Sequence, residues 1–126
     1  MELDWNQGEL KEGRRCYESG AFFEAHEHWE LVWLAAPEPE KAFLQGLIQV
    51  AASFHHYYQR DNCAGTIALL RSALRRLDGY PEEFAGVAVA PLRASIRSWL
   101  LALESDPLSS PPPIPPIELT ADGTTP

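Results

Sequence analysis

Prolines, glycines and short polar residues divide the first 105 residues into five segments, and within them apolar side chains recur at helical spacing. Helices are predicted over about 6–19, 22–35, 38–60, 63–78 and 91–103. Gly20 suits the left-handed residue that closes a helix, and Pro37 and Pro39 lack the N–H that a continuing helix needs. The pattern predicts an all-α fold, a compact bundle of about five helices.

The apolar stripes of these segments define the expected core. On the flank of the third stripe, Gly46 and Ser53 are small enough for a neighbouring helix to approach closely. The residues expected to face inward are Phe22, Ala25, Trp29, Val32 and Trp33, then Phe43, Leu44, Leu47, Ala51, Phe54 and Tyr58, then Ile67, Leu70, Leu74 and Leu77, and finally Leu92, Ile96, Trp99 and Leu103.

A weak internal repeat suggests how the helices are grouped. An offset of about 41 residues pairs Tyr17 with Tyr58 and Trp29 with Leu70, so each half reads as a helical hairpin with a tight turn. Two copies fall short of the three or so that a solenoid needs. We therefore expect a closed bundle made of two helical hairpins, with the fifth helix added.

The C-terminal segment differs in composition from the rest. Residues 106–126 hold seven of the eleven prolines, whereas residues 1–105 carry the helical pattern. We therefore expect an all-helical domain over 1–105 and a proline-rich extended tail over 106–126. Three roles are open for this tail. It is a ligand for a partner's aromatic groove, a spacer, or a strap laid over the domain through Ile114, Ile117 and Leu119.

Charge and hydropathy exclude some classes of function. The formal net charge is −8, which argues against nucleic acid as a partner because binding must neutralise phosphates. No stretch approaches the ~20 apolar residues of a membrane span, and no signal peptide is recognisable, so a cytoplasmic location without membrane contact is expected. Cys16 and Cys63 are too few for a disulfide scaffold.

The most concentrated chemistry lies between residues 24 and 30, where Glu24, Glu27 and Glu30 alternate with His26 and His28. The spacing fits neither the HExxH of zinc proteases nor the ExxH of di-iron bundles. On a helix, His26 and Glu30 lie one turn apart and can meet. Glu24 and His28 point the other way, toward solvent.

The third helix offers companions for this cluster. Gln45, Gln49 and His56 share its polar flank, and His55 lies at the edge of its apolar stripe. If the second and third helices pack antiparallel, His55 approaches the start of the second helix.

Two interpretations of the combined polar cluster remain open. In the first, His55 reaches His26 or Glu27, and a divalent transition metal is held by His26, Glu27, Glu30 and His55. In the second, a His–Glu pair and glutamine side chains satisfy one another across a helix interface. The chain has no recognisable nucleophile motif, so whether it is an enzyme is left undecided.

The motifs EAHE at 24–27, with Trp29-Glu30 and Trp33, and FLQGLIQ at 43–49 resemble the family known as domain of unknown function 309. The resemblance spans about residues 10–80 and implies a compact all-α fold in a bacterial or archaeal protein, with no activity assigned. Asp61 stands where a glycine is common, and His28 where an apolar residue is common. The motif positions in this chain are Glu24, His26, Glu27, Trp29, Glu30, Gln45, Gly46, Gln49 and His55.

These observations favour a non-enzymatic structural or protein-interaction module that self-associates or binds a protein partner. In this interpretation the motif residues organise the packing of the second and third helices. The alternative is a metal-binding protein or a metal-assisted hydrolase that uses the His/Glu cluster on those helices.

Overall fold

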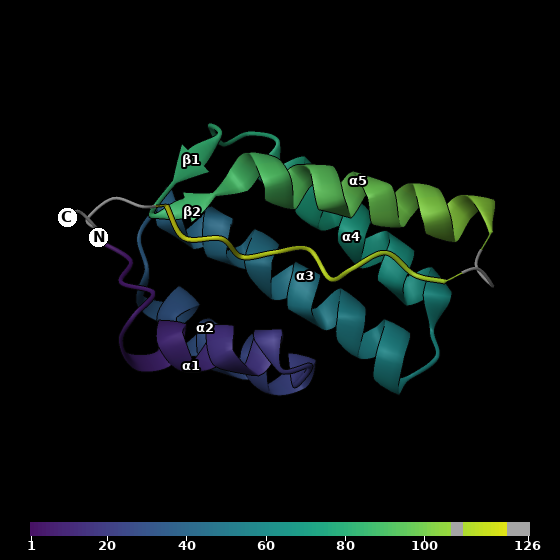
Figure 1. The fold of residues 1–126 in the computed structure, drawn as a ribbon. Helices are drawn as coiled ribbons and strands as arrows, with labels where there is room; N and C mark the ends of the chain where they lie inside the picture. Colours follow the sequence, from purple (N-terminus) through teal and green to yellow (C-terminus); the bar gives the residue numbers. More distant parts are fainter. Residues whose placement is uncertain (107–109, 121–126) are drawn as a thin grey trace.

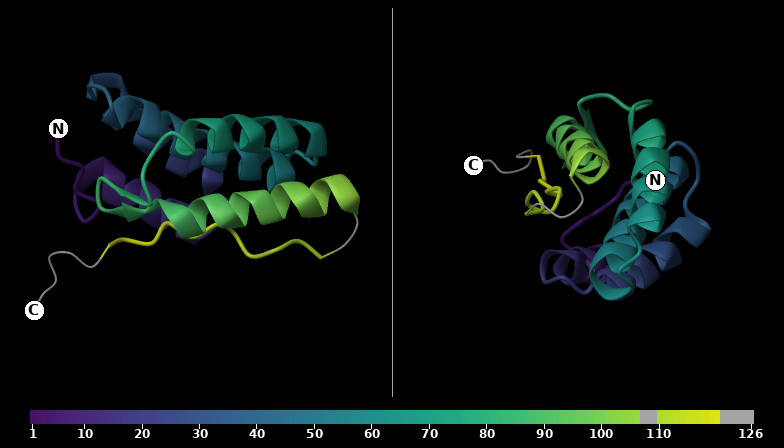
Figure 2. Two further views of the ribbon diagram at one scale, coloured as in Figure 1. Left: turned by 90° about the horizontal axis from the view of Figure 1, so that it is seen from above. Right: turned by 90° about the vertical axis from the view of Figure 1, so that its right-hand side faces the viewer.

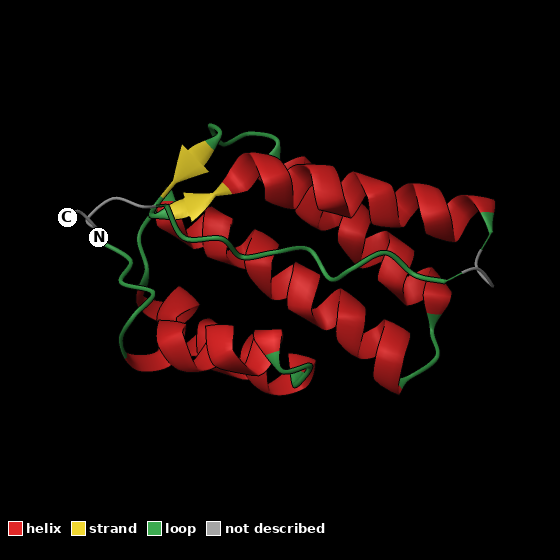
Figure 3. Ribbon diagram, viewed as in Figure 1, coloured by secondary structure: helices red, strands yellow, loops and turns green. Residues whose placement is uncertain are grey.

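The computed structural model describes residues 1–106 and 110–120, which form five α-helices and one short hairpin (Figures 1 and 3). The all-α prediction is confirmed, and no helix of this described part is both long and apolar enough to cross a membrane. The elements are α1 (Gly8–Glu18), α2 (Phe22–Ala35), α3 (Glu40–Gln59), α4 (Cys63–Leu77), β1 (Glu83–Phe84), β2 (Val87–Ala88) and α5 (Val89–Ser105).

Each helix packs on its neighbour in the chain, α1 on α2, α2 on α3, α3 on α4 and α4 on α5. The rings of Phe22, at the start of α2, and Phe54, near the end of α3, lie 5.7 Å apart, so these two helices are antiparallel. Seen end-on, the helices form an arc that is open on one side (Figure 2). The two predicted helical hairpins are α1–α2 and α3–α4.

The turns between the helices follow the predicted signals. Gly20 has a φ of 88°, which suits glycine and ends the first hairpin turn. Asp61, at the position where glycine is common in the resembling family, also adopts a positive φ of 48°. The side chain of Asn62 then caps α4, because its Oδ1 accepts a hydrogen bond from the Gly65 N–H at 2.9 Å.

The predicted start of the fifth helix is wrong by two residues, and the hairpin before it was not predicted. α5 begins at Val89, so Pro91 is its third residue, where a missing N–H still costs no helical hydrogen bond. The N–H groups of Val89 and Ala90 bond instead to the Glu82 carbonyl. The strands β1 and β2 are two residues each, too short for an alternating pattern to reveal.

The close approach predicted for the third helix is confirmed between α3 and α4. A Cβ built on Gly46 would lie 3.2 Å from the Leu77 side chain, so a larger residue would push α4 away. Ser53 is fully buried, and its carbonyl accepts a hydrogen bond from the Thr66 hydroxyl at 3.1 Å.

Trp29 is one of two tryptophans of the core with no exposed surface, the other being Trp99. Its indole lies directly against α1, where a Cβ on Gly13 would come within 2.3 Å of Nε1. The indole N–H points to the Leu10 carbonyl at 3.3 Å, and the rings of Trp5 and Tyr17 lie 6.2 and 5.8 Å away. Most of the predicted core is buried, and Val32, Trp33, Ile67 and Leu74 are partly buried against it. Tyr58 is 49% exposed, because its ring borders an open pocket that residues 114–118 line on the other side.

Residues 110–120, called the strap below, lie across the open side of the helical arc (Figures 1 and 2). The indole N–H of Trp99 in α5 donates to the Pro113 carbonyl, and the Tyr17 hydroxyl in α1 donates to the Pro115 carbonyl, both at 2.8 Å. Leu119 forms an antiparallel bridge with Val87 in β2. Over these residues the structure agrees with the strap alternative, and the strap connects the first and last helices.

We predict that Gly13→Ala destabilises the protein although alanine favours a helix more than glycine does. The added methyl group overlaps the Trp29 indole, and comparable overpacking in a core costs about 1–3 kcal/mol. Urea denaturation of both proteins measures this loss. Gly79→Ala is the matched control, because its nearest atom would lie at 3.5 Å, an ordinary contact. An equal loss of stability in both variants would contradict the close contact between Trp29 and Gly13.

We predict that the buried Tyr17 hydroxyl makes stability fall at alkaline pH. Burial raises the pKa of Tyr17 well above its usual value of about 10. Below pH 10 the phenol is neutral in the folded and unfolded chains. Above it, the unfolded chain releases the proton first, so the free energy of unfolding decreases as pH rises.

Tyr17→Phe removes this pH effect and, at pH 7, the hydrogen bond to Pro115, a cost of about 1 kcal/mol. Urea denaturation between pH 7 and 11 should therefore show the two proteins converging in stability as pH rises. A difference that stays constant over this range would contradict the prediction. The pKa values of Tyr58 and Tyr80 are also raised, but these residues are common to both proteins.

Candidate functional site

Helix α2 carries apolar side chains on two opposite faces. Its inner face buries Phe22, Ala25 and Trp29 against α1 and α3. On the other side three large apolar side chains remain exposed, Phe23 by 44%, Leu31 by 56% and Leu34 by 65%. Positions 23, 27, 30, 31 and 34 follow one side of a helix, so Glu27 and Glu30 lie among these apolar groups. We call Phe23, Glu24, Glu27, Glu30, Leu31 and Leu34 the outer face of α2.

The structure brings His26 and Glu30 together, as their spacing predicted. Nε2 of His26 lies 3.6 Å from Oε2 of Glu30, and the imidazole side chain is 25% exposed. Within the described residues, the other ring nitrogen, Nδ1, is buried and has no hydrogen-bond partner. The pair therefore occupies the border between the core and the outer face of α2.

His55 reaches the start of α2, but an aromatic ring lies between the two histidines. The Phe23 ring is 5.2 Å from the His55 ring and 5.8 Å from the His26 ring. Nδ1 of His55 lies 2.5 Å from the side-chain oxygen of Gln59 on its own helix. The three rings form a half-exposed aromatic cluster. In this arrangement the two imidazoles do not converge on one point where both could hold the same ligand.

The two remaining glutamates of the motif, Glu24 and Glu27, are exposed. They border a shallow hollow of about 390 Å³ together with His28, Glu30 and Leu31. The position of His28 on the helix predicted a side chain that points freely into solvent, and this prediction is wrong. Its Nδ1 lies 2.5 Å from Oε1 of Glu9, and this contact connects α2 with α1.

The two glutamines of the predicted cluster lie on α3, and both are half-buried. Gln49 contacts α4 rather than α2. Its amide donates to the Ser72 hydroxyl at 3.0 Å and accepts from the Arg76 guanidinium at 3.2 Å. Gln49 therefore organises the α3–α4 interface. Gln45 lies one turn before it on the same helix.

The predicted ligands therefore come together only in part. Across residues 1–106 and 110–120, no three His, Cys, Asp or Glu side chains form a group suited to a metal ion. His26 and Glu30 are adjacent, while Glu27 and His55 lie in the separate surroundings described above. Divalent-metal binding by these four residues stays a prediction.

Cys16 lies near this region, on α1. Burial and the carboxylates of Glu24 and Glu12 raise the pKa of its thiol, whereas the Arg15 guanidinium opposes them. A raised pKa keeps the thiol protonated at neutral pH, which is the opposite of what a nucleophilic cysteine needs.

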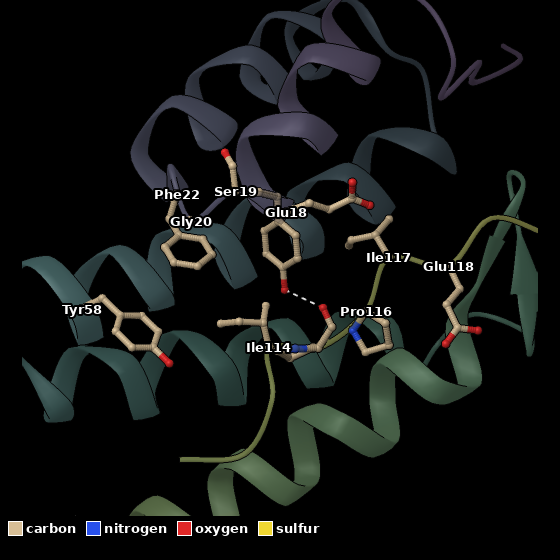
Figure 4. Close-up of a pocket in the computed structure, with 11 residues that line it drawn as sticks. Glu18, Ser19, Gly20, Phe22, Tyr58, Ile114, Pro116, Ile117 and Glu118 are labelled. Carbon is tan, nitrogen blue, oxygen red and sulfur yellow. Dashed lines mark hydrogen bonds between the residues drawn. The ribbon is translucent and has the colours of Figure 1, made fainter. Parts of the chain in front are cut away.

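A larger hollow lies elsewhere, beside the strap (Figure 4). Its volume is about 740 Å³, in the range of small-ligand sites. Tyr17, Phe22 and Tyr58 line one side, and strap residues 114–118 line the other. Partial burial, with a smaller contribution from Tyr57, raises the pKa of Tyr58, so its phenol stays neutral.

Sequence reasoning missed this pocket because its walls come from three separate stretches of the chain, residues 17–22, Tyr58 and residues 114–118. The signal that could have indicated it was the set of apolar residues spaced among the tail prolines, Ile114, Ile117 and Leu119. Those residues pointed to a strap. Nothing in the spacing indicated that the strap leaves space beside Tyr58.

Comparison with known proteins identifies one family and one relative. The model for the family described as "Domain of unknown function (DUF309)" matches residues 10–69, which run from α1 into α4. An "Uncharacterized protein" from Aquifex aeolicus (strain VF5) is 30% identical over 92 residues. That alignment covers 72% of this chain but 27% of the relative, so the chain spans about a quarter of the relative's length.

The matched residues contain both motifs on which the resemblance rests, EAHE on α2 and FLQGLIQ on α3. They also contain every residue of the predicted polar cluster, from Glu24 to His55. The strap and α5 lie outside the matched range. Over residues 10–69, this chain matches the DUF309 family.

Proposed function

We propose that this domain is a non-enzymatic protein-interaction module whose binding surface is the outer face of α2. The observation that carries the proposal is the exposure of Phe23, Leu31 and Leu34 on a helix that is already anchored in the core by its opposite face. Apolar side chains gathered on one helix face are typical of a surface that a partner covers.

The anchoring of α2 supports this proposal, because a rigid binding surface loses little entropy on association. Trp29 holds α2 against α1, and Phe22 packs on Phe54 of α3. His28 adds its contact with Glu9 on α1. In this view, some motif residues fix the helix and others present the surface. His26 belongs to the first group through its half-buried ring.

The charges on this face favour a partner that carries basic side chains. Glu24, Glu27 and Glu30 lie among the apolar residues, and His26 is the neighbour of Glu30. Two copies of this face packed together would place carboxylates against carboxylates, which is unfavourable. An amphipathic helix with Lys or Arg beside its leucines would match both the apolar stripe and the carboxylates. We therefore favour a basic helical partner over self-association.

The length of the relative from Aquifex aeolicus supports the role of a module. This chain spans about a quarter of that protein, so the unit the two share is small compared with the polypeptide in which it occurs there. A helical unit that presents one prepared face can serve within a longer polypeptide.

We predict that a designed amphipathic peptide of roughly 18 residues, made of Leu and Lys, binds the outer face of α2. In ¹H–¹⁵N NMR spectra the largest shifts should fall on residues 23–34. The variant Glu24→Lys/Glu27→Lys should weaken binding about tenfold or more, equivalent to about 1.4 kcal/mol, because it reverses two charges beside the apolar groups.

The matched control is Glu82→Lys/Glu83→Lys, which makes the same change in net charge at two exposed glutamates near the hairpin. It should bind the peptide as the wild type does. A peptide of the same composition without an amphipathic pattern should not bind. Equal weakening by both double variants would show attraction to net charge alone and would count against a defined surface.

Divalent-metal binding at His26 and Glu30 is the second candidate, because the buried Nδ1 of His26 lacks a partner among the described residues. We expect the melting temperature to be the same in chelator and in Zn²⁺, Mn²⁺, Ni²⁺ or Fe²⁺, because two adjacent ligands hold a metal weakly. His26→Ala should melt lower under all conditions, since it leaves space beside the core. A metal-specific rise that vanishes in His26→Ala would replace the interaction proposal with a metal site.

A further inference from the structure

The strap lies in a groove whose two walls both bind it through aromatic side chains. We propose that this groove, formed by α1, the end of α3, α5 and β2, is a binding site for extended proline-rich segments of the pattern Pro-x-Pro-x-Ile. The strap, with Pro113, Pro115 and Ile117 in these positions, is its tethered occupant. The ligand class is thus a proline-rich peptide, and the site is separate from the outer face of α2.

The hydrogen bonds in the groove suit a proline-rich ligand. Proline has no N–H, so at its proline positions such a segment can form hydrogen bonds only through its carbonyl groups. The groove supplies two side-chain donors and directs them at carbonyls two residues apart. Trp99 donates to Pro113 and Tyr17 donates to Pro115, each at 2.8 Å. Aromatic donors that contact a preformed extended segment are a general solution to proline recognition.

Two buried side chains of the strap indicate which residues the groove selects. Pro115 is buried, and Ile117 is 5% exposed. They alternate with Ile114 and Pro116, which are half-buried, and all four border the pocket beside the strap (Figure 4). Alternation of buried and half-buried residues is what an extended chain in a groove produces. The Ile position is therefore the main apolar anchor of the pattern.

The end of the strap is held by backbone pairing. The Ala88 N–H donates to the Glu118 carbonyl at 2.8 Å, and the Thr120 N–H donates to the Gly86 carbonyl at 2.9 Å. These bonds flank the isolated bridge between Val87 and Leu119 and attach the strap to the edge of β2. Pairing of this kind needs only backbone groups, so the same edge accepts another segment of equal shape.

The pocket shows that the strap does not fill its groove. About 740 Å³ lies between the strap and the rings of Tyr17, Phe22 and Tyr58, and the Tyr58 side chain is 49% exposed. A segment with a larger apolar residue at the position of Ile114 would gain contact with these rings. A segment from another protein that carries such a residue can therefore bind the groove more tightly than the strap does.

Tethering determines when such a segment can enter. A ligand on the same chain acts at an effective concentration of about millimolar, so an external peptide must compete with it. In the intact chain the groove is thus open only to peptides that bind better than the strap or are abundant. Weakening the strap should expose the site.

The experiment uses the full chain with Ile117→Asp and a synthetic peptide of residues 110–120. The indole N–H signal of Trp99 in ¹H–¹⁵N spectra reports the bond to residue 113, and the indole signals of Trp29 and Trp33 serve as internal references. We expect the Trp99 signal to move in the variant and to return to its wild-type position when the peptide is added. The wild type should bind the peptide at least about tenfold more weakly than the variant.

Two further peptides define the site. A peptide with Ile117→Asp should not restore the Trp99 signal, and one with Ile114→Trp should restore it at lower concentration. Adding Tyr17→Phe to the variant chain should weaken the wild-type peptide about fivefold, the effect of one neutral hydrogen bond.

The proposal is overturned if the folded variant leaves the Trp99 signal displaced at millimolar peptide. If Ile117→Asp does not fold alone, the helical circular-dichroism signal is followed while the peptide is added during refolding. Recovery of helix with the wild-type peptide, but not with the Ile117→Asp peptide, supports the site. No recovery with either overturns it.

Discussion

The contact between Trp29 and Gly13 is the constraint on which the N-terminal half of this structure depends. An indole with no exposed surface fits against a helix only where that helix has no side chain, and Gly13 provides this place on α1. The position of α1 in turn sets the position of Tyr17, four residues further along. Tyr17 is the α1 residue that bonds the strap, so a core contact on α2 determines where the C-terminal segment can be held.

The helices could be predicted from the sequence because their signals are local. Gly20, Pro37 and Asn62 act on the backbone within a few residues, and apolar spacing along one helix needs no knowledge of its neighbours. The hairpin before α5 could not be predicted, since its strands are two residues long and its register is set partly by the strap. Tyr58 was assigned to the core because periodicity along α3 cannot show that its ring borders an open pocket.

In the candidate site too, contacts within one helix could be predicted from the sequence, whereas contacts between helices could not. The meeting of His26 and Glu30 follows from their spacing on one helix. The partner of Gln49 does not, because it depends on which of two neighbouring helices α3 presents that flank to, and the structure places Ser72 and Arg76 there. His55 reached the predicted end of α2, yet Phe23, an adjacent residue without any polar signal, separates it from His26.

The strap has a consequence for how the protein forms during synthesis. Helix contacts are made mostly between neighbours in the chain, so they can form as the chain emerges, whereas the bond from Tyr17 to Pro115 joins residues 98 positions apart. Until the strap has left the ribosome, α1, α2 and α3 can be assembled while the Tyr17 side of the groove is still uncovered. In that interval the nascent protein presents an apolar surface that its finished form largely hides, and a chaperone or a partner present at the ribosome would meet that surface before the strap does.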